Sequence, residues 1–102
     1  MDRSLAVDGI DEFYGVVAPF SIVRRSHPVP SGSLHLHCTD GDGEWLVAPR
    51  DGQLVLTHEH AKGAVAWRAP AVSLVLAAWG RSKLGVDVFG DQSVSEEWSR
   101  LA

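Results

Sequence analysis

Residues 34–39, with the sequence LHLHCT, decide the fold. Their apolar side chains alternate with polar ones, and a period of two is typical of a β-strand with one buried face. The acidic, glycine-rich segment DGDG at 40–43 then turns the chain, and WLVA at 45–48 predicts a second strand. The middle of the chain is therefore a sheet with a buried side and a polar side.

Two further strands are predicted downstream. The dipeptide Asp51-Gly52 is a strong two-residue hairpin signal, so QLVLTH at 53–58 should pair antiparallel with the second strand. AVAWR at 64–68 is short and apolar, and it lies between a glycine and a proline, which predicts a fourth strand. Four consecutive strands with short turns predict a meander.

Three helices complete the pattern. Asp8 can cap a helix that runs to about Ala18, in which the apolar residues recur with a helical period, and this helix should stop at Pro19. Residues 71–79 are apolar on every side and predict a buried helix that ends at Gly80, while Asp91 can cap a last helix. We expect an α+β fold: a small antiparallel sheet of four or five strands with the helices packed on one face.

Composition supports one domain over residues 1–102, with 45% hydrophobic and 22% charged residues. The net charge of −4 and the lack of a basic stripe argue against nucleic acid as a partner. The single cysteine, Cys38, forms no internal disulfide and lies on the apolar face of its strand, where a thiol is inert. No apolar run is long enough for a membrane span, and we expect a cytoplasmic location.

Four of the five histidines form two His-x-His pairs, His35 with His37 and His58 with His60. Alternation along a strand would place both members of each pair on one face, where imidazoles can bind zinc. No Cys, Asp or Glu stands at a spacing that completes a familiar ligand set. We therefore expect no metal on this chain and interpret the pairs as residues of the polar face.

Arg81 is the strongest candidate for a site residue. It follows the helix-ending Gly80, where its charge either caps the helix or clamps a carboxylate through two hydrogen bonds. Asp40 either caps its turn or faces a ligand, and Trp45 either fills the core or stacks on a ligand. The candidate ligand-binding residues are His35, His37, Asp40, Trp45 and Arg81.

Four short motifs in a fixed order point to a family: PVPSGSLHLHCTD at 28–40, GEWLV at 43–47, WGR at 79–81 and VFGD at 88–91. The chain resembles, over nearly its whole length, the C-terminal domain of the mycothiol-dependent maleylpyruvate isomerase family of actinobacteria. The resemblance implies a fold similar to that of sterol carrier proteins.

In that family a DinB-type four-helix domain holds a divalent metal and receives mycothiol, and the C-terminal domain lends a basic side chain. The resemblance assigns that auxiliary catalytic role to Arg81. The 102 residues contain no such bundle, since only one helix is predicted before residue 28. We therefore expect an accessory domain that is not an enzyme on its own, with metal and mycothiol on a DinB-type partner.

Two other functions remain open. The same fold with an apolar tunnel would carry a small hydrophobic, lipid-like ligand. A structural or dimerising module would instead use the face with His35 and His37 against a partner, including a second copy of the chain. Tight packing between sheet and helices would argue against the carrier, and a pocket that reaches Arg81 would favour the accessory domain.

Overall fold

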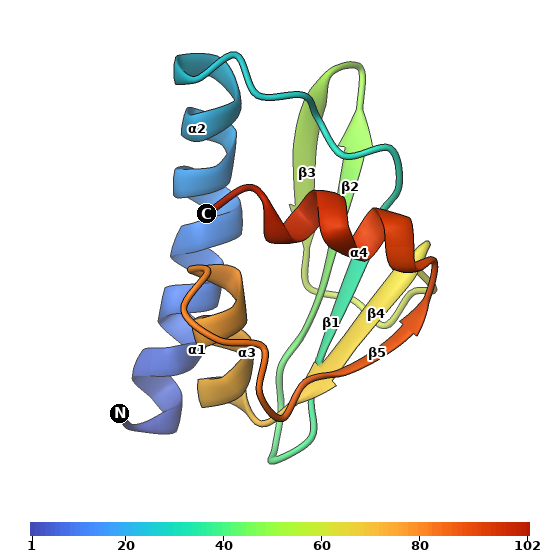
Figure 1. Cartoon of the computed structure of the whole chain (residues 1–102). Helices are drawn as coiled ribbons and strands as arrows, with labels where there is room; N and C mark the ends of the chain where they lie inside the picture. The colour runs from blue at the N-terminus through green and yellow to red at the C-terminus, as the bar shows by residue number, and fades with distance from the viewer.

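The computed structural model describes all 102 residues and shows a five-stranded sheet covered on one face by helices (Figure 1). The strands are β1 (Leu34–Cys38), β2 (Glu44–Arg50), β3 (Gln53–Thr57), β4 (Val65–Ala69) and β5 (Asp87–Gly90). Their order across the sheet is β3-β2-β1-β4-β5, so the strand that opens the sheet in sequence lies at its centre. The expected α+β architecture is confirmed.

The strand order differs from the predicted meander. β4 follows β3 in sequence but pairs in parallel with β1, where Leu36 lies opposite Trp67, while the other neighbouring strands are antiparallel. The connection from β1 to β4 runs through β2, β3 and the loop at 58–64. The predicted meander was wrong, because short turns indicate which strands follow one another in sequence but not which strands pair in the sheet. A place beside β1 buries Trp67 completely beneath the helices.

The N-terminal helix is longer than predicted at both ends. It consists of α1 (Arg3–Glu12), a π-helical segment (Phe13–Val17) and α2 (Ala18–Arg24), which form one column in Figure 1. Asp2, not Asp8, caps it, because its carboxylate accepts hydrogen bonds from the N–H groups of Ser4 (2.7 Å) and Leu5 (3.2 Å). The π-helical turn shifts the hydrogen-bond register just before Pro19, so the proline does not end the helix.

The other two helices match the prediction. They are α3 (Ala71–Ala78) and α4 (Gln92–Ser99). Gly80 follows α3 with a φ of +74°, and Asp91 caps α4 by accepting from the N–H groups of Ser93 (2.9 Å) and Val94 (3.3 Å). None of the helices has the length and apolar character that crossing a lipid bilayer requires.

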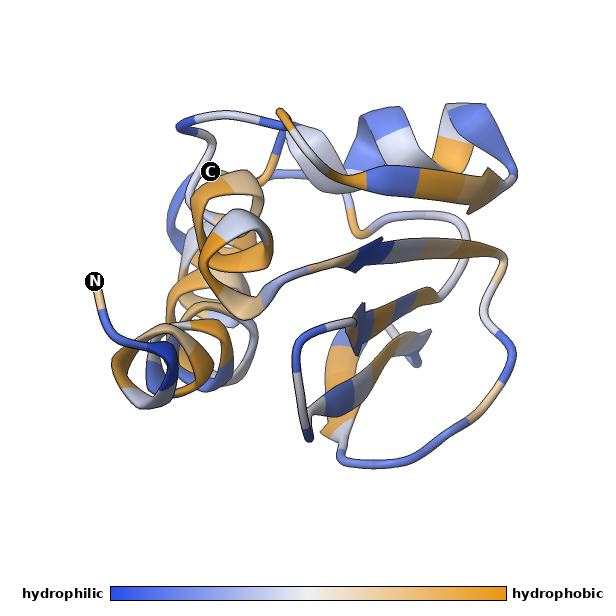
Figure 2. Ribbon diagram, turned by 90° about the horizontal axis from the view of Figure 1, so that it is seen from below, coloured by the Kyte–Doolittle hydropathy of each residue, from blue (hydrophilic) through white to orange (hydrophobic).

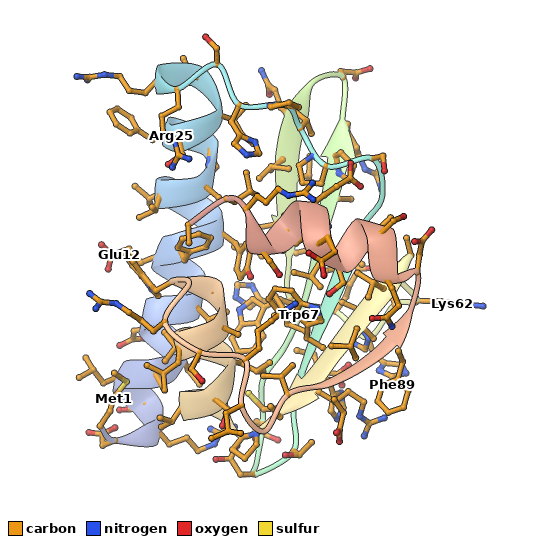
Figure 3. All side chains as sticks on the ribbon, viewed as in Figure 1. Met1, Glu12, Arg25, Lys62, Trp67 and Phe89 are labelled. Carbon is orange, nitrogen blue, oxygen red and sulfur yellow. The ribbon has the colours of Figure 1, made fainter.

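Indole rings fill the space between the sheet and the helices. Trp45, Trp67 and Trp98 are at most 1% exposed. Trp67 Nε1 donates to Ser95 Oγ of α4 at 2.9 Å, and Trp45 Nε1 donates to Asp11 Oδ1 of α1 at 2.8 Å. Figure 3 shows Trp67 between the two layers, and Figure 2 shows hydrophobic stretches (orange) on the helices and strands joined by largely hydrophilic loops (blue). The helices therefore share one face of the sheet.

The β2–β3 turn yields a prediction about stability. Asp51 and Gly52 have φ angles of +53° and +77°, and the residues on either side of them, Arg50 and Gln53, are paired. Two consecutive positive φ angles identify a type I′ turn. We expect Gly52→Val to destabilise the domain by about 1 kcal/mol or more, because a β-branched residue is strained at positive φ.

Thermal unfolding followed by circular dichroism measures this effect. No atom outside the turn lies within 4 Å of a Cβ at position 52, so backbone strain is the only expected cause. Gly52→Asn is the matched control, since asparagine tolerates the left-handed region and should unfold near the wild-type temperature. An unchanged melting temperature for Gly52→Val would contradict the turn.

Candidate functional site

The face of the sheet opposite the helices carries a cluster of polar side chains. The leucines of β1 point toward the helices, so His35 and His37 point to this open face. Strand pairing places Glu44 of β2 on one side of His37 and Arg68 of β4 on the other. Two of the predicted site residues therefore lie side by side at the centre of the sheet.

One carboxylate oxygen joins three imidazoles. Glu44 Oε2 lies 2.9 Å from His35 Nε2 and 3.1 Å from His37 Nδ1. The same oxygen lies 2.6 Å from Nδ1 of His60, which comes from the loop after β3. One ring nitrogen of each histidine and one oxygen of Glu44 all lie within 4.8 Å of one another. We call these four residues the His₃Glu cluster.

The charge of Glu44 follows from these surroundings. Burial raises the pKa of this carboxyl, but the imidazoles of His60, His35 and His37 outweigh burial and hold the pKa at about 2. Glu44 is therefore ionised at neutral pH. His37 Nδ1 is buried and has no hydrogen-bond partner, although Glu44 lies nearby.

The second His-x-His pair is divided between two places. His58 Nε2 lies 2.7 Å from Asp11 Oδ1 of α1, whereas His60 reaches the cluster. The prediction that these two histidines share one face was wrong, because β3 ends at Thr57 and strand alternation does not extend to them. Glu44 was not predicted as a site residue. Its pairing with His37 across the turn at 39–43 was the one signal that could have identified it.

A groove of about 360 Å³ between α1 and α3 forms the second candidate site. Its lining residues are Met1, Leu5, Asp8, Gly9, Glu12, Val75, Leu76, Trp79 and Arg81. Figure 3 places Met1 and Glu12 along one side of the molecule, and Lys62 and Phe89 at the opposite edge of the sheet. The groove lies in the helical layer and the His₃Glu cluster lies on the face of the sheet opposite the helices, so the two are on opposite sides of the domain.

Arg81 caps α3 through its backbone. The Arg81 N–H donates to the Leu76 carbonyl at 2.8 Å, and the Gly80 N–H donates to the Ala77 carbonyl at 3.1 Å. This pair of bonds is a Schellman motif. The exposed guanidinium takes no part in it and lines the groove. The helix cap is therefore made by the backbone and not by the charge of Arg81, and the carboxylate clamp stays a prediction.

Asp40 and Trp45 lie apart from both sites. Asp40 Oδ1 accepts hydrogen bonds from the Ala71 N–H at 3.1 Å and from Arg3 Nε at 3.3 Å. The bond from Ala71 is the main cause that lowers the pKa of Asp40 below its ordinary value. Trp45 belongs to the core, as does Cys38, whose thiol pKa is raised by burial.

The outer face of the helical layer exposes many large apolar side chains. Several large apolar side chains of the N-terminal helical column, of α3 and of its C-cap residue are 36–82% exposed: Leu5, Val16, Phe20, Val23, Leu76 and Trp79. Exposed apolar surface of this kind is typical of a face that meets another protein or a ligand. Leu5, Leu76 and Trp79 also line the groove, so groove and apolar face are continuous.

Comparison with known families gives one match, to a family described as the MDMPI C-terminal domain, over residues 4–97. No curated protein sequence matches the chain significantly.

Solved structures with the same fold include sterol carrier protein domain 2 of Helicoverpa armigera, with a TM-score of 0.65 and 11% identity over 91% of this chain and 84% of that one. A UbiJ-SCP2 ubiquinone synthesis protein has a TM-score of 0.63 and 19% identity over 97% and 94% of the two chains. The sec-alkylsulfatase Pisa1 from Pseudomonas sp. has a TM-score of 0.66 and 18% identity over 90% of this chain but 16% of its own. The fold is therefore that of sterol carrier proteins.

The structural role of Asp40 can be tested by pH. We expect Asp40→Ala to lower the unfolding temperature near pH 7, because the Ala71 N–H at the start of α3 loses its acceptor. Folding lowers the pKa of Asp40 from 3.8, so its ionised form stabilises the fold above about pH 3.8. That contribution is lost as the pH falls below 3.8, and the wild-type and Asp40→Ala melting temperatures should converge.

Asp42→Ala is the matched control, because Asp42 lies in the same turn with an exposed side chain. Its melting temperature should follow that of the wild type at every pH. A difference between wild type and Asp40→Ala that is equally large at pH 7 and pH 2.5 would contradict this role.

Proposed function

The chain belongs to the MDMPI C-terminal domain family, and from this membership we propose that it is an accessory, non-catalytic domain of a mycothiol-dependent isomerase- or transferase-like system. In this proposal it covers or completes an active site on a DinB-type four-helix partner domain. Mycothiol and the catalytic metal belong to that partner. The contribution of this chain is a binding surface and one arginine.

The groove that reaches Arg81 carries the proposal. An arginine held only by its backbone has its guanidinium available for a ligand, and the groove beside it is largely apolar. Such a combination binds a small organic anion, because the apolar walls hold its carbon skeleton and the guanidinium pairs with its charge.

The exposed apolar face supports contact with a partner domain. Three of its side chains line the groove, and the others extend along the column formed by α1 and α2. A partner seated there would cover both the apolar face and the groove. The Arg81 guanidinium would then lie at the boundary between the two domains, where a shared active site needs it.

The alkylsulfatase provides a structural precedent. The matching part is 16% of its chain, so a domain of this fold can be a small part of a much larger enzyme. The family description also names a C-terminal domain, which in such proteins follows another part of the chain. Both facts favour an accessory role over an independent one.

Arg81 orients a substrate and does not activate a thiol. A guanidinium holds a carboxylate through two parallel hydrogen bonds, but it has only N–H donors and no acceptor that could take the proton of a thiol. Asp8 and Glu12 line the same groove and repel a second carboxylate. The ligand therefore presents one anionic group to Arg81 and a neutral part to the remaining walls.

A small hydrophobic-ligand carrier is the second candidate function. The sterol-carrier fold and the apolar lining of the groove favour it. The indole rings fill the space between sheet and helices, so a carried ligand would also have to lie in the groove between α1 and α3. The two functions differ in whether binding depends on the charge of Arg81.

The accessory role can be tested by measuring whether this chain raises the turnover rate of a partner domain. A DinB-type mycothiol-dependent domain without its own C-terminal domain is mixed with this chain, and its rate on a carboxylate substrate is measured. We expect wild type to raise the rate and Arg81→Ala to lose most of the increase, because removing a charged partner of a bound carboxylate costs about 2 kcal/mol or more, roughly 30-fold. Arg25→Ala, which removes an exposed arginine at the end of α2, is the matched control.

Ligand titration separates the two functions. Octanoate and octanol are titrated against the chain, and the Trp79 indole N–H resonance reports on the groove. An anion site should prefer octanoate and lose this preference in Arg81→Ala, with the melting temperature unchanged because the helix cap is a backbone feature. Equal binding of both ligands by wild type and variant would identify a carrier. No effect of the chain on partner turnover would contradict the accessory role.

A further inference from the structure

The His₃Glu cluster lies on the side of the domain that neither the groove nor the proposed partner uses. We propose that His35, His37, Glu44 and His60 bind one divalent transition-metal ion. This inference is independent of the proposed function, because it involves the open face of the sheet rather than the helical layer.

The geometry of the four groups is that of a ligand set. Donors bound at 2.0–2.2 Å to a tetrahedral ion lie roughly 3.3–3.6 Å apart. Glu44 Oε2 already lies 2.9 and 3.1 Å from the donor nitrogens of His35 and His37, and all four donors lie within 4.8 Å of one another. Side-chain shifts of up to about 0.6–0.8 Å each would bring all four donors to this tetrahedral spacing.

Hydrogen bonding alone leaves the cluster incomplete. One carboxylate oxygen has about two lone-pair directions, yet three imidazole nitrogens converge on Glu44 Oε2. His37 Nδ1, which is buried, is the nitrogen left without a partner. An unpaired buried nitrogen is costly, and a shared metal ion would satisfy it together with the other three donors.

Three of the four donors are held in place before any ion binds. His35 and His37 belong to the central strand, which is paired on both sides, and Glu44 lies in register with His37 on β2. His60 comes from a loop and is exposed, so it can move aside and close over an entering ion. This combination of a rigid base and one mobile ligand gives the site an entry path.

A cavity of about 320 Å³ adjoins the cluster and is lined by His35 and His60 together with Lys62, Arg68 and Phe89. The two cations oppose the approach of a metal ion, so the carboxylate of Glu44 is the group on which binding depends most. Three imidazoles and one carboxylate suit zinc and its neighbours in the first transition row rather than calcium or magnesium.

The expectation of no metal rested on spacing along the sequence. No carboxylate stands near either histidine pair at a familiar interval, but the pairing of β1 with β2 brings Glu44 beside His37. The loop at 58–64, which connects β3 to β4, then adds His60. The structure thus provides the ligand whose absence had argued against a site.

Metal titration of the untagged, chelator-treated full chain tests the proposal. Isothermal titration with Zn²⁺ should show one equivalent bound with a dissociation constant of about 1 µM or tighter. Bound Zn²⁺ should also raise the melting temperature, because it binds the folded chain only. Loss of a second-shell partner weakens metal sites 10–100-fold, so Glu44→Gln, which removes a ligand, should weaken binding by at least about 100-fold.

His60→Ala and His58→Ala form the matched pair, since both remove a histidine from the same loop but only His60 belongs to the cluster. We expect His60→Ala to weaken Zn²⁺ binding and His58→Ala to leave it unchanged. Titration with Co²⁺ gives a second readout, because its visible absorption bands should appear with wild type and disappear with Glu44→Gln. Circular dichroism of each metal-free variant confirms that it folds.

Three results would overturn the proposal. The first is less than one equivalent of bound Zn²⁺, and the second is binding that Glu44→Gln leaves unchanged. The third is equal weakening by His58→Ala and His60→Ala, which would mean that scattered surface histidines bind the ion.

Discussion

The parallel pairing of β1 with β4 is the constraint on which the rest of the structure depends. In this register Leu36 lies opposite Trp67, and His37 lies opposite Arg68. Side chains alternate between the two faces of a sheet, so the register sends one pair toward the helices and the other to the open face. A slip of one residue would expose Trp67 and bury charged groups, and the burial of the indole therefore enforces the register.

The same pairing explains how a loop residue reaches the centre of the open face. β3 is the edge strand on one side of the sheet, whereas β4 lies beyond β1 on the other. The loop between them has to pass from one side to the other, and along this path His60 approaches Glu44 on β2. A meander would have needed no such crossing and would have kept this histidine at the end of its own strand. The His₃Glu cluster is thus a consequence of strand order.

Features that depend on strand order could not be predicted from the sequence, whereas features of local origin could. Local sequence patterns correctly predicted the buried and open faces of β1, the Asp51-Gly52 hairpin and the helix cap at Asp91, because each depends on residues close together in the chain. The family motifs predict the fold but not the order of its strands. The continuation of the helix past Pro19 depends on a π-helical turn that has no periodic signal. The His₃Glu cluster depends on contacts between distant segments, which no local pattern encodes.

The two candidate sites share one scaffold, and their charged groups lie outside its apolar core. Trp45, Trp67 and Trp98 fill the core between the sheet and the helices, whereas the Arg81 guanidinium and the polar groups of the His₃Glu cluster are not part of that core. Asp40 joins the layers at one end by binding the start of α3 from the turn after β1. Because a close-packed core holds both faces in place, the charged groups on either face can change without unfolding the domain. This separation of packing from surface chemistry is the physical reason why one fold can serve carriers, enzyme domains and accessory domains.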